Sequence, residues 1–199
     1  MKKIVLIITA MLIAIGSDAQ TAKSVLDKCA STLSAKKGVS ANFTMESAQY
    51  GNNSGTISVK GRMFTASTSA ATMWFDGKTL WTYLAKNNEV NVSTPTEAQL
   101  QALNPYTFIN MYKEGFTYTM TKNDKNYTVH LTATDSKRRV QELFITIDNK
   151  SYVPSEVKMR QGSKWTVFHI SNFKVTSLND RVFSFNSKDY PTAEVVDLR

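Results

Sequence analysis

The chain has 199 residues, of which 42% are hydrophobic and 20% are charged, and its formal net charge is +8. That length suits one domain with a single core, and the apolar and aromatic content speaks against wholesale disorder. One cysteine excludes an intramolecular disulfide, and with only two histidines it also excludes a cysteine-rich structural zinc site.

The first residues have the pattern of an export signal. The basic pair Lys2-Lys3 precedes an apolar run over residues 4–15, and small residues follow up to Ala19. A basic start, a short apolar core and small residues before the cut are typical of a signal peptide, and the run is short for a membrane anchor. We therefore predict residues 1–19 as a signal peptide cleaved after Ala19, a periplasmic location, and one mature domain over residues 20–199. Cleavage lowers the formal net charge from +8 to +7, because it removes two lysines and one aspartate.

The segment Ala22–Lys36 is predicted to be a helix that Gly38 ends. Val25, Cys29 and Leu33 recur at helical spacing, with charged residues elsewhere. Cys29 lies on this apolar stripe, and no nearby residue would lower its pKa. We expect a buried structural thiol.

From Ala41 onward the hydrophobic period changes to two, which predicts strands. The dipeptide Asp76-Gly77 stands between two aromatic runs and is a strong hairpin signal. A final extended piece is expected around 182–185. We count about eleven strands with turn signals at the spacing of an all-β barrel or sandwich.

A helical insert interrupts the strands. Thr94-Pro95-Thr96-Glu97 matches a capping box with Thr94 as the N-cap, which predicts a short helix through Leu103. Asn104-Pro105 then starts a second, aromatic helix that Gly115 ends.

Chemical motifs are scarce. His130 and His169 fall on separate predicted strands without a metal-ligand pattern, and no Gly-x-Ser-x-Gly elbow is present. The sequence therefore predicts no catalytic residue, no metal site and no cofactor. Its basic residues cluster only at Lys36-Lys37 and Lys137-Arg138-Arg139, which favours attraction to anionic lipid headgroups or an acidic partner over nucleic acid.

Alternating apolar residues mark one face of the predicted strands as the candidate core or ligand surface. Periodicity alone leaves a filled core and a cavity both open, although Met45, Met73, Met111 and Met120 favour a cavity because thioethers adapt to varied apolar shapes. The strand residues of this face are Phe43, Met45, Ile57, Val59, Phe64, Trp81, Tyr83, Val90, Val92, Phe116, Tyr118 and Met120.

The order of these elements resembles the LolA family of periplasmic outer-membrane lipoprotein carriers, in its Bacteroides-type form. The resemblance spans nearly the whole mature chain. It rests on Gly38-Val39-Ser40-Ala41-Asn42-Phe43-Thr44, on Trp74-Phe75-Asp76-Gly77-Lys78-Thr79-Leu80-Trp81-Thr82-Tyr83, on Asn88-Glu89-Val90, on the insert with Pro95 and Asn104-Pro105, and on Phe183-x-Phe185 with Glu194-Val195-Val196-Asp197.

The resemblance implies an unclosed antiparallel β-barrel with an N-terminal helix and a helical lid over an apolar cavity. It also implies a monomeric carrier, not an enzyme, that takes acylated lipoproteins from an inner-membrane ABC exporter to the outer membrane. An outer-membrane receptor is not identified by the sequence. The strand face above would then line the acyl cavity, and Leu103, Phe108 and Met111 would contribute from the lid.

One motif departs from the family pattern. Family members carry an Arg-Pro pair whose arginine ties barrel to lid, whereas this chain has Lys60-Gly61-Arg62-Met63-Phe64. Arg62 is the candidate latch. It stands about one position away from the place of the family's arginine, and a shift of one position in a strand turns the side chain to the other face. This displacement leaves open a LolA-like sensor or binding module for another hydrophobic ligand or protein. An exported hydrolase that uses His130 or His169 is the third alternative.

Overall fold

The strands pair into a single sheet in the computed structural model, which describes residues 21–34, 36–49, 51–96, 99–100 and 111–199. One α-helix, α1 (Ala22–Leu33), precedes them, and two short 3₁₀ helices, η1 (Asp180–Phe183) and η2 (Ser187–Asp189), follow β11. The strands are β1 (Val39–Ser47), β2 (Asn53–Lys60), β3 (Met63–Thr68), β4 (Ala71–Phe75), β5 (Leu80–Leu84), β6 (Glu89–Ser93), β7 (Phe116–Lys122), β8 (Asn126–Ala133), β9 (Glu142–Asp148), β10 (Pro154–Gln161), β11 (Lys164–Val175) and β12 (Glu194–Asp197).

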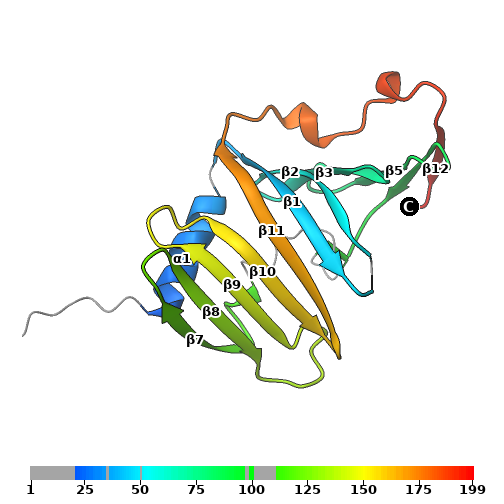
Figure 1. The fold of residues 1–199 in the computed structure, drawn as a ribbon. Helices are drawn as coiled ribbons and strands as arrows, with labels where there is room; N and C mark the ends of the chain where they lie inside the picture. Colours follow the sequence, from blue (N-terminus) through cyan, green and yellow to red (C-terminus); the bar gives the residue numbers. More distant parts are fainter. Residues whose placement is uncertain (1–20, 35, 50, 97–98, 101–110) are drawn as a thin grey trace, which may run out of the picture.

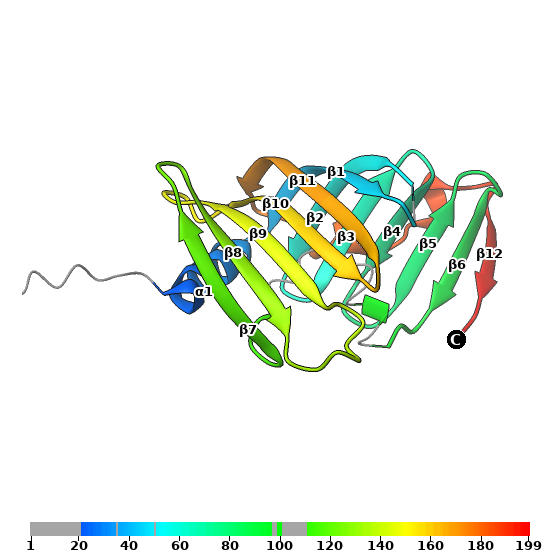
Figure 2. The same cartoon turned by 60° about the horizontal axis from the view of Figure 1, so that its bottom comes forward.

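The sheet curves strongly but does not close. Its order is β12-β6-β5-β4-β3-β2-β1-β11-β10-β9-β8-β7, so β12 and β7 are its two edges (Figures 1 and 2). All pairs are antiparallel except β12 with β6, which run parallel. The expected unclosed antiparallel β-barrel with an N-terminal helix is confirmed. The described residues hold twelve strands where about eleven were expected from turn spacing.

The helix α1 packs against the sheet near β7 and β8. Thr21 caps it, because the Thr21 hydroxyl accepts a hydrogen bond from the Ser24 amide at 3.2 Å. Its apolar stripe, including Val25, Leu26 and Cys29, is almost fully buried. The helix ends at Leu33, three residues before the predicted end.

The Asp76-Gly77 turn is present as predicted between β4 and β5. One Asp76 carboxylate oxygen accepts hydrogen bonds from the amides of Lys78 and Thr79 at 2.9 and 2.7 Å. Gly77 has φ +101°, a conformation that side chains disfavour. Local turn chemistry thus sets the register in which Trp74 faces Trp81.

The insert has a different cap from the one predicted. The Thr96 amide donates to Gln99 Oε1 at 2.8 Å, and the Gln99 amide donates back to Thr96 Oγ1 at 3.3 Å. This reciprocal pair is a capping box in which Thr96 is the N-cap, so the prediction of Thr94 was wrong by two residues. Most of the two predicted helices, over 101–110, lies outside the described residues.

The C-terminal segment also differs from expectation. The predicted extended piece around 182–185 begins instead with the 3₁₀ turn η1, and the strand comes later, as β12 beside β6. Asn179 caps η1 by accepting a hydrogen bond from the Arg181 amide. Within the described part of the chain, no helix is long and apolar enough to cross a membrane.

Candidate functional site

The two faces of the sheet can be followed through the strand register, because paired residues point to the same side. Val39 pairs with Val59, Val59 with Phe64, Phe64 with Phe75, and Phe75 with Leu80. We call the face that carries these residues the inner face. It packs on α1, and the opposite side is the outer face.

The end of the inner face beneath α1 is filled. Leu131, Leu143, Ile145 and Ile147 are fully buried there, together with the helix stripe. Burial raises the pKa of the Cys29 thiol to about 12, in keeping with a structural thiol.

A hydrogen bond joins α1 to the end of the insert. The Tyr112 hydroxyl donates to an Asp27 carboxylate oxygen, and Lys23 pairs with the other oxygen at 2.7 Å. Hydrogen bonds from Lys23 and then from Tyr112 lower the pKa of Asp27. The Tyr112 ring is almost fully buried, so the contact fixes where the insert returns to the barrel.

The other end of the inner face is apolar but only half covered. Phe43 and Met45 on β1 pair with Ile170 and Phe168 on β11, and Met159 follows on β10. All five side chains are half-buried. We call these five residues the inner apolar band, and it is the candidate ligand surface.

Gly55 allows this band to form on a tightly packed part of the sheet. It pairs with Phe43, and a Cβ atom there would lie 2.0 Å from the carbonyl oxygen of Ser67 and 3.1 Å from the Phe43 ring. The strand can therefore accept only glycine without a shift of backbone. Phe43 consequently rests over bare backbone.

Four predicted residues do not share this face. Trp81 and Tyr83 pair with Val92 and Val90, and the register places all four on the outer face. Val90 and Val92 are buried and Trp81 and Tyr83 are half-buried, and Tyr190 of the C-terminal segment covers Tyr83. The expectation that they line the same surface as Phe43 was wrong.

An aromatic cluster on the outer face fixes that cover. Tyr190 packs against Tyr83 and Trp74, with ring centroids 4.5 and 5.5 Å apart, and Phe185 packs 5.7 Å from Trp74. Phe183 is fully buried. These rings form a second, smaller apolar core.

The remaining predicted residues divide between core and partly covered positions. Ile57, Val59, Phe64 and Phe116 are buried in the main core, while Met111, Tyr118 and Met120 pack against it and stay half-buried. Leu103 and Phe108 lie outside the described residues.

Sequence reasoning missed three members of the inner apolar band, namely Met159, Phe168 and Ile170. The alternation in β11 is apolar on both phases, with Trp165 and Val167 on one and Phe168 and Ile170 on the other. Only the pairing of β1 with β11, which are more than a hundred residues apart, decides which phase points inward.

The two histidines lie on the outer face, His130 on β8 and His169 on β11. His130 stacks on Phe144 with ring centroids 4.1 Å apart and lies 3.3 Å from Glu142, while His169 lies 3.5 Å from Glu156. The Arg160 guanidinium and, less strongly, His130 lower the pKa of Glu142. The described residues contain no group of three or more potential metal ligands.

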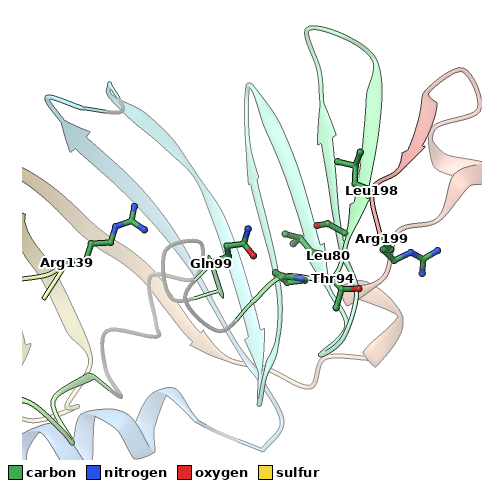
Figure 3. Close-up of a pocket in the computed structure, with 8 residues that line it drawn as sticks. Leu80, Thr94, Gln99, Arg139, Leu198 and Arg199 are labelled. Carbon is green, nitrogen blue, oxygen red and sulfur yellow. The ribbon is translucent and has the colours of Figure 1, made fainter.

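A pocket of about 580 Å³ opens at the edge of the inner face (Figure 3). It lies where β5 begins and β6 ends, beside the β8–β9 connection and the C-terminus. It is lined by Leu80, Ser93, Thr94, Pro95, Gln99, Arg139, Leu198 and Arg199.

Comparison with known families identifies this architecture. A family profile described as "Outer membrane lipoprotein carrier protein LolA" matches residues 12–163. The chain belongs to the LolA family. The match ends before β11, so the C-terminal cover of the outer face lies beyond the matched part of this LolA chain.

The chain is also similar to solved structures, to differing degrees. An uncharacterized conserved protein from Thermus thermophilus has a TM-score of 0.61 at 14% identity, covering 89% of this chain and 99% of its own. A LolA superfamily protein from Nitrosomonas europaea has a TM-score of 0.46 at 11% identity, with 84% and 99% covered. A putative outer membrane lipoprotein-sorting protein domain from Vibrio parahaemolyticus has a TM-score of 0.43 at 13% identity, with 83% and 96% covered. No curated protein matches.

The LolA latch stays a prediction. Arg62 is exposed in the turn between β2 and β3, directly after Gly61, which has φ +60°. The lid that it would hold lies largely outside the described residues. The Bacteroides-type assignment also stays a prediction.

Proposed function

We propose that the protein carries lipoproteins across the periplasm by holding their acyl chains against the inner apolar band. The observation that carries the proposal is this half-buried band of phenylalanine, methionine and isoleucine on an unclosed sheet of a LolA family member. Stable monomers normally cover such a surface, so a band left half covered marks a place for a ligand.

The energetics of acyl chains require such a carrier. Each CH₂ group that leaves water is stabilised by about 0.8 kcal/mol, so several long chains exposed together are unfavourable by tens of kcal/mol. Two of the band's five residues, Met45 and Met159, are flexible thioethers that adapt to varied chains. A loosely fitted surface also favours release at the acceptor membrane.

The insert is the proposed cover of the band. Its described ends are held by the Thr96–Gln99 capping box and by the Tyr112–Asp27 hydrogen bond. A segment anchored at both ends suits a lid that opens for cargo and closes behind it. Arg62 is the proposed latch.

The remaining assignments complete the same proposal. Residues 1–19 would direct export and be removed, and residues 20–199 would act as one domain and as a monomer without cofactor or catalytic step. The donor would be an inner-membrane ABC exporter. Attraction of the net positive charge to anionic headgroups would aid encounter with membranes.

Two neighbouring residues of β11 give a matched binding test. Phe168 belongs to the inner apolar band, and Val167 points to the outer face, yet both are half-buried. Phe168→Gln should weaken binding of a fluorescent diacylated lipopeptide to the mature protein about tenfold, because it removes roughly 1.5 kcal/mol of apolar contact. Val167→Gln should change the affinity less than about twofold.

Equal effects of the two substitutions would contradict the location of the site. Failure of the unaltered protein to bind the lipopeptide, together with native mass spectra free of co-purified lipid, would remove the carrier function itself. Depletion in the cell separates a carrier from a sensor: loss of a carrier leaves outer-membrane lipoproteins at the inner membrane, and normal sorting would favour the sensor.

A further inference from the structure

The pocket at the edge of the inner face has a polar side that includes two arginines. Ser93, Thr94 and Gln99 face it together with two arginines, and none of its eight lining residues is aspartate or glutamate. Its volume of about 580 Å³ falls in the range of small-ligand sites. The lining therefore favours a ligand group that accepts hydrogen bonds and carries negative charge.

The two arginines are not equivalent. Arg199 is already bound, since its Nε and Nη2 donate to the Asp197 carboxylate at 2.9 and 2.6 Å. Arg139 stands on the opposite side of the pocket in Figure 3 and makes no ion pair among the described residues. Arg139 is thus the arginine of this pocket whose guanidinium no described carboxylate already pairs with.

The neighbours of Arg139 in the basic run Lys137-Arg138-Arg139 do not share this position. The Arg138 guanidinium lies 5.0 Å over the ring of Phe116, and Lys137, which is exposed as Arg139 is, does not line the pocket. The sequence cluster therefore contributes one cation to the pocket. This separation also provides a control residue for mutation.

The neutral polar groups present hydrogen-bond donors. Gln99 uses its side-chain oxygen to accept from the Thr96 amide and hydroxyl, which leaves its NH₂ group to donate. The hydroxyls of Ser93 and Thr94 add donors from the end of β6. Donors and a guanidinium together are what carboxylate or phosphate oxygens require.

The pocket adjoins the apolar inner face. Leu80 lies on this face and lines the pocket, and Pro95 and Leu198 add further apolar lining. A ligand in this pocket would thus have apolar surface on one side and charged and polar groups on the other. That arrangement suits an amphiphile.

We propose that this pocket binds the anionic head group of an amphiphile, a carboxylate or phosphate, with Arg139 as its principal charged contact and the acyl chain directed onto the inner face. The inference rests on the proposed function, because the acyl chain would lie on the face that carries the inner apolar band. It adds that the protein discriminates its ligands by head-group charge as well as by chain.

The test compares two probes that have the same acyl chain and differ in the charge of the head group. Palmitoyl lysophosphatidylglycerol is anionic and monopalmitoylglycerol is neutral, and both are titrated against the mature protein by displacement of a fluorescent acyl probe. Palmitate serves as a third probe and distinguishes carboxylate from phosphate. The unaltered protein should prefer the anionic probes about tenfold, and the preference should fall in about 1 M NaCl.

Arg139→Gln should remove this preference and leave the affinity for monopalmitoylglycerol unchanged, whereas Lys137→Gln should retain the preference. Equal affinity of the unaltered protein for the anionic and neutral probes would overturn the head-group site while leaving the acyl carrier intact. An equal loss for all probes in Arg139→Gln would also overturn it. If none of the probes binds the unaltered protein while the diacylated lipopeptide does, the head-group site is overturned and the carrier function stands; if the lipopeptide also fails to bind, the proposed function fails as well.

Discussion

Phe183 is the residue on which the C-terminal cover of the outer face should depend most. It is fully buried within η1, which packs on β3 and β4, and Lys60 holds the same segment through Asp180 at 2.7 Å and the Leu178 carbonyl at 2.9 Å. Phe183→Ala removes a buried ring and leaves a cavity, a change for which we expect a loss of about 3–5 kcal/mol. That loss is a large share of the roughly 5–15 kcal/mol by which a domain is stable.

Equilibrium urea unfolding of the mature chain, followed by far-UV circular dichroism, measures this effect. Phe185→Ala is the matched control, since its ring packs on Trp74 but stays half-exposed and should cost about 1 kcal/mol. Under conditions where Phe183→Ala remains folded, lipopeptide binding should be unchanged, because the inner face is untouched. A loss below about 1 kcal/mol for Phe183→Ala, or one equal to that of Phe185→Ala, would refute the assignment of a second core.

Three further outcomes are expected. Gly55→Ala should destabilise by more than about 2 kcal/mol because its Cβ would lie 2.0 Å from a backbone oxygen, whereas Gly162→Ala, with φ +60° and open space, should cost only about 1 kcal/mol in the same urea assay. Tyr112→Phe should lower stability by about 1 kcal/mol at neutral pH. Because the pKa of Asp27 is lowered in the fold, this difference should persist above about pH 4 and shrink as pH falls through the folded-state pKa. Cys29 should react with Ellman's reagent at about pH 8 only in denaturant, and rapid native labelling would contradict its burial.

Features that depend on local chemistry could be predicted from the sequence. The helix stripe through Cys29 and the hairpin at Asp76-Gly77 need only residues within a turn or two of each other, and both are present. The capping box was misplaced because Thr94 and Thr96 both stand three residues before a suitable Glu or Gln partner. Local pattern alone could not choose between them.

The inner and outer faces could not be told apart in the same way. Trp81 and Tyr83 have the two-residue spacing of core residues, but the C-terminal segment gives the outer face an apolar cover of its own. In β11 both phases are apolar, so Phe168 and Val167 were equally suitable as inner residues. A long-range pairing decides each case, and no short pattern encodes it.

The inner face has a filled end and a half-covered end, and substitutions at the two ends should have different effects. Leu143 and Ile145 are fully buried beneath α1, whereas Phe168 and Ile170 are half-buried on β11. Substitutions at the filled end lose packing in the free protein, while polar substitutions in the inner apolar band lose mainly contact that a ligand would supply. Stability and binding are therefore expected to vary separately along the same face of one sheet. In a carrier of the proposed kind, the inner apolar band could then be tuned to new cargo without rebuilding the core that holds it in place.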